Sequence, residues 1–278
     1  MPRLWPLAAL LCLPAFAQDP PASLDRAVDR LYNFDFPSSH AILDRLIAAN
    51  PRDPLPYAFR ASAYLFTELD RMGVLESEFL IDDRKIAAKK RPAEPDPATA
   101  ARFQKAAAEA QSRGEAALRA DPADRRALFA LSVTGGVTTD YMALVEKHQF
   151  MSLSLARRSN AYAQELLRLD PQFYDAYLTA GFSDYMVGSL PFFIRWFVHF
   201  DNVSGSKERG VHDLQLTADR GHYLRPLAQI LLGIIDLREK RLAPAQSRLV
   251  DLVRAYPGNP LFRKELDKMN EKLGPAAN

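Results

Sequence analysis

Side chains that could bind a metal are widely spaced in this sequence of 278 residues. A zinc site on a helix commonly uses two histidines four residues apart, together with a glutamate. No histidine of this chain has another at that spacing, and no glutamate accompanies one as in a metalloprotease; the five are His40, His148, His199, His212 and His222. The sequence therefore predicts no metal site and no cofactor.

Nucleotide binding and acyl transfer also lack their motifs. Gly205-Ser206-Lys207 has residue types found in a phosphate loop, but the Gly-Lys-Ser/Thr order and the upstream glycine of that motif are missing. We expect a turn there instead, in which Ser206 caps a helix beginning near Lys207 and Glu208 lies in its first turn. No serine lies in a Gly-x-Ser-x-Gly sequence. We therefore predict no catalytic residue.

Proline ends helices at four places, and this repetition tells us how the chain is organised. The four pairs are Asn50-Pro51, Asp121-Pro122, Asp170-Pro171 and Tyr256-Pro257. Proline has no N–H to donate and restricts the residue before it, so a helix stops there and another can begin a few residues later. Apolar residues before the prolines recur at helical spacing, as Leu249, Leu252 and Tyr256 do. The pattern indicates successive helices.

The helix after each proline carries a large residue and, four positions later, a small one. The pairs are Tyr57 with Ala61, Leu128 with Ser132, Tyr177 with Gly181 and Gln229 with Gly233. A small residue lets the two helices of a hairpin approach closely. This pattern resembles the tetratricopeptide repeat, whose unit is a pair of antiparallel helices of about 34 residues.

The resemblance implies an all-α fold, a right-handed superhelix of about five helical hairpins. The hairpins are predicted at 23–50, 54–121, 125–170, 174–221 and 224–256, followed by a capping helix at 260–273. Because the prolines are unevenly spaced, we also predict insertions near 73–97 and 188–206. No proline ends the fourth hairpin, where we expect Gly221 to supply a left-handed cap.

A longer likeness covers residues 173–241. It rests on Phe-Tyr-Asp-Ala-Tyr-Leu-Thr-Ala-Gly at 173–181, on Ser-Leu-Pro-Phe-Phe at 189–193 and on Asn-Val-Ser-Gly-Ser-Lys-Glu-Arg-Gly at 202–210. Those elements, in that order, are similar to bacterial secreted tetratricopeptide proteins and, more distantly, to the eukaryotic inclusion-body clearance proteins and their animal relatives. The resemblance implies an adaptor without catalysis.

The inner helix of each hairpin would line a concave groove, and its residues are the first candidate site. The candidates that we assign to partner binding are Leu55, Ser62, Leu65, Arg126, Phe129, Val133, Asp175, Phe182 and Tyr185. Most of them are apolar, which fits an extended peptide or an amphipathic helix better than a charged carboxylate terminus. The alternative is that these residues form the core between repeats.

The second candidate is the aromatic segment 190–200, with four phenylalanines and one tryptophan in eleven residues. If it is exposed, Phe192, Phe193, Arg195 and Trp196 would form a patch for a partner or for peripheral contact with a membrane surface. If it is buried, it is a helix packed under the repeats. It is too short to cross a membrane, which takes about 20 residues.

The N-terminal residues predict export. Arg3 precedes the apolar run 4–16, and Ala15-Phe16-Ala17 is a small-x-small cleavage site, so we expect a signal peptide at 1–17 and a mature chain at 18–278 in the periplasm or outside the cell. The single cysteine, Cys12, lies inside that segment. A formal net charge of +2 gives no general attraction to nucleic acid.

These features predict a non-enzymatic scaffold of the cell envelope that binds a protein or a peptide in the groove. Two alternatives stay open. One is an assembly factor that docks to a membrane or a membrane protein through 190–200, and the other is a cryptic enzyme subunit. The identity of the partner and the oligomeric state do not follow from the sequence.

Overall fold

The computed structural model describes residues 22–82, 84–85, 93–189 and 205–273. Every regular element in this part of the chain is a helix, which confirms the predicted all-α class for it. The elements are α1 (Leu24–Tyr32), α2 (Phe36–Ala49), α3 (Pro54–Arg71), α4 (Ser77–Leu80), α6 (Pro97–Ala120), α7 (Arg125–Asp140), the π-helix η1 (Tyr141–Val145), α8 (Gln149–Leu169), α9 (Ala176–Ser189), α11 (Lys207–Arg220), α12 (Arg225–Arg238), α13 (Leu242–Ala255) and α14 (Pro260–Leu273).

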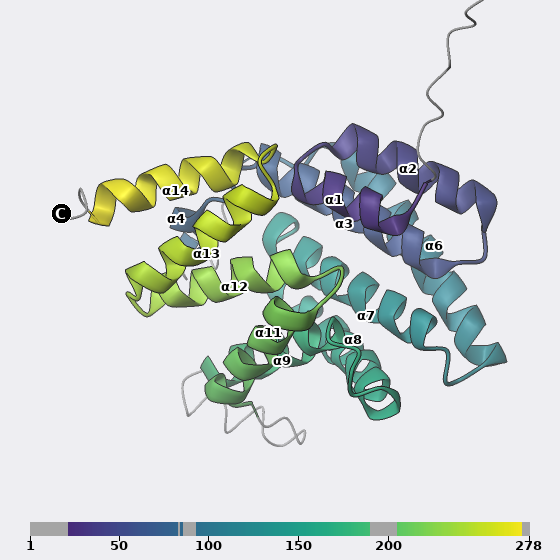
Figure 1. Ribbon diagram of the computed structural model, residues 1–278. Helices are drawn as coiled ribbons and strands as arrows, with labels where there is room; N and C mark the ends of the chain where they lie inside the picture. Colours follow the sequence, from purple (N-terminus) through teal and green to yellow (C-terminus); the bar gives the residue numbers. More distant parts are fainter. Residues whose placement is uncertain (1–21, 83, 86–92, 190–204, 274–278) are drawn as a thin grey trace, which may run out of the picture.

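The helices form successive hairpins (Figure 1). The pairs α1 with α2, α3 with α6, α7 with α8, α9 with α11, and α12 with α13 each pack together, and α14 packs on α13. Their limits lie within a few residues of the predicted hairpins. The first helices of neighbouring pairs also pack together, α3 on α7 and α7 on α9.

The same turn follows four of the helices, and it explains why they end at a proline. The N–H of the second residue after the proline donates a hydrogen bond to the carbonyl of the residue that precedes the proline. The four bonds run from Asp53 to Asn50, from Asp124 to Asp121, from Phe173 to Asp170 and from Asn259 to Tyr256, at 3.0 to 3.2 Å. The side chains of Asp53, Asp124 and Asn259 then cap the next helix.

The helix pair α9 with α11 is packed through glycines. A Cβ on Gly210 would lie 2.5 Å from the Tyr185 nitrogen, and one on Gly181 would lie 2.8 Å from the Gly210 carbonyl oxygen. These distances allow only glycine without a shift of the backbone. Gly181 therefore has the expected role, whereas Gly233 does not, because its nearest neighbour is the Cδ of Arg248 at 4.0 Å.

The predicted left-handed cap at Gly221 is wrong. The residue has φ −61° and ψ 152°, an ordinary extended conformation. A Cβ there would lie 2.5 Å from the Thr217 carbonyl oxygen and 2.9 Å from Asp175 Oδ1. The glycine thus makes room for the buried Asp175 carboxylate, which accepts the backbone N–H groups of residues 222, 223 and 224 at 2.9 to 3.1 Å.

Ser206 does cap α11, as predicted from the sequence. Its hydroxyl oxygen accepts the Arg209 N–H at 3.2 Å, and α11 begins at Lys207 with Glu208 in its first turn. Gly205-Ser206-Lys207 is therefore the N-terminus of a helix, and its serine caps the third N–H of that helix.

The two ends of the array meet. Figure 1 shows the C-terminal helices beside the N-terminal hairpin, and the Tyr32 and Tyr256 rings lie 5.5 Å apart. Asn259 Nδ2 donates to the Tyr32 carbonyl at 2.8 Å. Buried residues of α1, α3, α7, α9 and α12 share one hydrophobic core. The inner helices therefore enclose a filled interior.

The predicted insertion near 73–97 begins with α4, which reaches the C-terminal helix. Glu76 pairs with Lys264 at 2.8 Å and with Lys268 at 3.1 Å, and Ser77 donates to Glu265. The end of the insertion is held by Glu68, which is fully buried and accepts the Asp96 N–H at 2.8 Å. The other predicted insertion contains 190–204, which lies outside the described residues.

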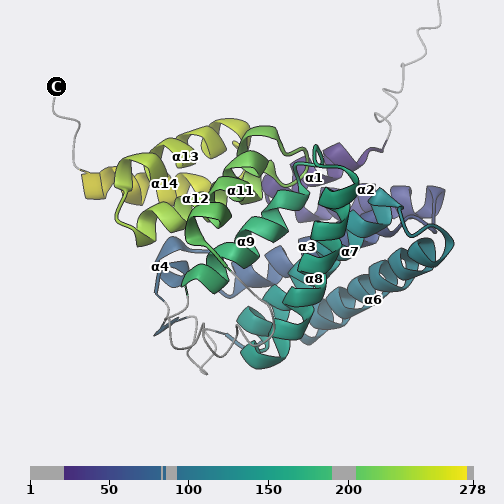
Figure 2. The ribbon, with the colours of Figure 1, turned by 90° about the horizontal axis from the view of Figure 1, so that it is seen from below.

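One described stretch, Arg125–Val145, is long and apolar enough to cross a membrane, and half of its apolar window is buried. It comprises α7 and η1. Seen from below, α7 lies amid its neighbours (Figure 2), and it packs against α3, α6, α8 and α9. This central place in the fold accounts for its hydropathy.

Candidate functional site

Most of the predicted groove residues lie inside the protein. Seven are buried, and these are Leu55, Ser62, Leu65, Phe129, Val133, Asp175 and Tyr185. Phe182 is partly buried against the same core, and the side chain of Arg126 is 50% exposed. Inter-repeat packing, the alternative interpretation, therefore fits the buried seven. A partner can reach Arg126 and part of Phe182 in this structure, so binding at the other positions stays a prediction.

The candidate site is a cleft of about 560 Å³ formed where several loops between hairpins converge. We call it the loop cleft, and it is lined by Leu55, Asp121, Ala123, Asp124, Arg125, Arg126, Phe129, Phe173 and Tyr223. These residues come from the beginnings of α3 and α7 and from the loops before α7, α9 and α12. Three of the predicted groove residues, Leu55, Arg126 and Phe129, thus meet here.

Two ion pairs tie neighbouring loops together at this cleft. Arg126 at the start of α7 binds Asp53 through two hydrogen bonds, Nε to Oδ1 at 2.9 Å and Nη2 to Oδ2 at 2.7 Å. Arg125 binds Asp170 in the next loop at 2.9 Å. The hydrogen bonds that Arg126 donates to Asp53 raise the pKa of the Arg126 guanidinium above its ordinary value. A bidentate pair fixes direction as well as distance, so these contacts hold the three loops in register.

The floor of the loop cleft is aromatic. Phe129 is buried, and its ring centroid lies 5.0 Å from Phe173 and 6.2 Å from Tyr223. Tyr223 also packs 5.5 Å from Phe59 of α3. Burial raises the pKa of Tyr223, so its hydroxyl stays protonated at neutral pH. Phe173 and Tyr223 are only partly buried and present apolar surface to the cleft.

Two carboxylates of the rim are in no ion pair that the structure records. Asp121 Oδ1 accepts the Ala123 N–H at 3.0 Å, and Asp124 Oδ1 accepts the Ala127 N–H at 3.0 Å. Both bonds shape the backbone of the turn, and the charge of Asp124 also helps to raise the pKa of the neighbouring Arg126. The arrangement can therefore bind a group by contact and charge, and it positions no nucleophile beside a base.

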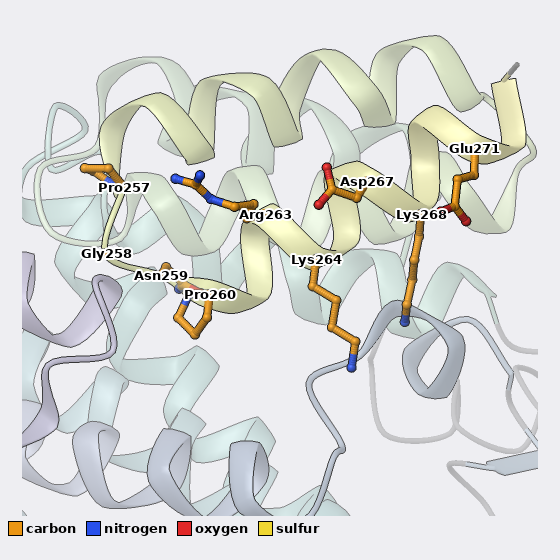
Figure 3. Close-up of a pocket in the computed structure, with 9 residues that line it drawn as sticks. All are labelled: Pro257, Gly258, Asn259, Pro260, Arg263, Lys264, Asp267, Lys268 and Glu271. Atoms are coloured by element: carbon orange, nitrogen blue, oxygen red, sulfur yellow. The ribbon is translucent and has the colours of Figure 1, made fainter. Parts of the chain in front are cut away.

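Two other clefts are lined mainly by charged groups and turn residues. One, of about 600 Å³, follows α14 (Figure 3), where Lys264 and Lys268 point toward α4 and Asp267 lies on the opposite side. The other, of about 660 Å³, lies between Asp29 to Asp35 and the turn at Pro257 and Gly258. Neither has the aromatic floor of the loop cleft.

No group of three or more histidine, cysteine or acidic side chains that could hold a metal occurs among the described residues. The aromatic candidates Phe192, Phe193, Arg195 and Trp196 and the predicted signal peptide lie outside them.

Comparisons with protein-family models, with curated proteins and with solved structures found no match. The loop cleft is therefore interpreted from its own residues.

Sequence reasoning missed Phe173 and Tyr223 as members of a site. Phe173 had a signal, because it stands two residues after Pro171, where two other loops carry the capping residues Asp53 and Asp124. Tyr223 had none, because it lies beside Phe59 of α3 and Phe129 of α7 only in the folded chain and is more than 90 residues from either in the sequence.

Proposed function

We propose that this chain is a non-enzymatic scaffold of the cell envelope that binds a segment of another polypeptide at the loop cleft. The observation that carries the proposal is the convergence of loops from several hairpins on an aromatic floor, with Arg126 and Arg125 tying each loop to the next. Such a site is held by packed helices and displays a fixed surface to a partner.

We also propose that the array is a tetratricopeptide-like right-handed superhelix, wound tightly enough for its ends to meet. The successive hairpins, the repeated proline turn and the glycine contacts between α9 and α11 support it. Because packed side chains fill the inner surface of the array, we place the binding site at the loop cleft and not in the concave groove. The envelope location rests on the predicted signal peptide.

The test uses two tryptophan variants of the full chain. Ala123 is exposed in the loop cleft, and Ala108 is exposed on α6, away from it. Ala123→Trp adds bulk to the cleft and leaves the core untouched, and Ala108→Trp is the matched control. Each tagged protein is incubated with envelope extract, and the bound polypeptides are compared by quantitative mass spectrometry.

We expect at least one polypeptide to bind the wild type and Ala108→Trp equally and to be depleted from Ala123→Trp. Equal recovery of the same polypeptides by all three proteins would show that the loop cleft is not the binding site. Recovery of no polypeptide by the wild type would contradict the scaffold function itself.

A further inference from the structure

We infer that the loop cleft selects a basic segment, an extended peptide in which an aromatic or aliphatic side chain is followed closely by lysine or arginine. The inference rests on the proposed function and names the chemistry of its partner. It follows from three properties of the cleft, which are its charge, its helix ends and its floor.

The rim is negative once the partners of its arginines are counted. Asp121 and Asp124 line the cleft together with Arg125 and Arg126, and the two guanidinium groups are paired with Asp170 and Asp53, which lie beside the lining. Both guanidinium groups are already paired with a carboxylate, which offsets the positive charge that an acidic ligand would meet. A basic ligand meets the carboxylates of Asp121 and Asp124 without displacing a cation.

The helix ends do not reverse this preference. The N-termini of α3 and α7 lie at this cleft, and a bare N-terminus favours an anion. Here Asp53 accepts the Leu55 N–H and Asp124 accepts the Ala127 N–H, so each helix start already carries a carboxylate of the protein. A ligand anion would meet that negative charge at both helix starts.

The floor provides the apolar half of the site. Phe173 and Tyr223 are partly exposed beside the buried Phe129, so an apolar side chain that settles there removes aromatic surface from water. A lysine or arginine stem can lie along the same rings while its charged head reaches the rim. The cleft therefore suits apolar and basic residues next to each other.

The direct test compares two fluorescein-labelled hexapeptide amides, Leu-Tyr-Xaa-Leu-Xaa-Ser, in which Xaa is lysine in one and glutamate in the other. Fluorescence anisotropy with the full chain gives both dissociation constants, at low and at high salt. We expect the lysine peptide to bind about tenfold more tightly at low salt, as two partly exposed ion pairs would give. High salt should reduce the difference between the two dissociation constants, because it screens the ion pairs.

The variant Asp121→Asn/Asp124→Asn removes both charges, while asparagine keeps the turn and the helix cap. Asp267→Asn/Glu271→Gln makes the same change of net charge on α14. We expect the first variant to lose the selectivity for lysine and the second to keep it. A preference for the glutamate peptide, absence of binding by the lysine peptide, or equal losses in both variants would overturn the inference. The proposed function is tested separately by the tryptophan variants, so the two can fail independently.

Discussion

At the scale of single residues, the fold depends on a glycine that leaves room for a buried carboxylate. Asp175 is 4% exposed and accepts three backbone N–H groups at the start of α12. Gly221 leaves the space that this carboxylate needs. A loop that carries Tyr223 into the candidate site thus depends on one carboxylate and on the absence of one methyl group.

Replacement of Gly221 by alanine tests that dependence. We expect a loss of about 1–3 kcal/mol in the free energy of unfolding, because the new Cβ would crowd the Thr217 carbonyl and Asp175. Gly233→Ala in α12 is the matched control and should be neutral or stabilising by up to about 1 kcal/mol, because alanine favours helix and the space is open. Urea denaturation measures both. Equal effects would refute the steric role of Gly221.

Asp140 predicts a pH dependence of stability. Burial raises the pKa of its carboxyl group to about 7 in the folded chain. Between the ordinary pKa of aspartate, about 4, and pH about 7, the unfolded chain releases a proton that the folded chain keeps, so stability falls as pH rises through this window. Asp140→Asn should flatten the fall and be more stable than the wild type at pH about 8, by up to about 4 kcal/mol. Parallel curves for the two proteins would contradict the shift.

At the scale of helices, the sequence is informative about where each hairpin begins and ends. The X-Pro pairs at 50–51, 121–122, 170–171 and 256–257 act through local turn chemistry, which neighbouring residues alone determine. The groove was harder to predict. Helical periodicity shows that Leu55 and Phe129 belong to an apolar face, but whether that face is exposed depends on distant residues such as Tyr223, which lies against Phe129 and comes more than 90 residues later in the chain.

The first insertion provides a test at this scale. Arg71 binds Glu68 through two hydrogen bonds three residues apart on α3, and Arg168 binds Glu165 in the same way on α8, but Glu68 is fully buried and Glu165 is 41% exposed. Glu68→Gln should cost about 1–3 kcal/mol in the free energy of unfolding, because one of the two buried acceptor oxygens becomes an NH2 group that faces the donors it used to accept. Glu165→Gln should change stability little. Chemical denaturation measures the stability of both variants. A larger loss in Glu165→Gln than in Glu68→Gln would contradict the role given to Glu68.

At the scale of the whole molecule, the ends of the array are held together by polar contacts between α4 and α14 as well as by the tyrosines at 32 and 256. Lys268 is central to them, because it pairs with Glu76, Glu78 and Glu265 at 3.1 to 3.6 Å. These contacts raise the pKa of Lys268, and it stays charged across the physiological range.

Lys268→Ala should therefore loosen the contact between α4 and α14. We expect amide hydrogen exchange to accelerate about fivefold or less in these two helices, the scale of partly exposed ion pairs, and to stay unchanged in α7. Lys272→Ala, at the exposed end of α14, is the control and should leave exchange in α4 unchanged. Faster exchange throughout the chain would mean that the contact supports global stability instead.

Site-specific photo-crosslinking tests the central claim most directly, that a polypeptide binds at the loop cleft. A benzophenone amino acid replaces Ala123 in the cleft or Ala108 on α6, and both proteins are irradiated in envelope extract. We expect a discrete protein adduct from position 123 that is absent from position 108. The partner peptides cross-linked to position 123 should be rich in lysine or arginine. The same adducts from both positions, or adducts from position 108 alone, would contradict it.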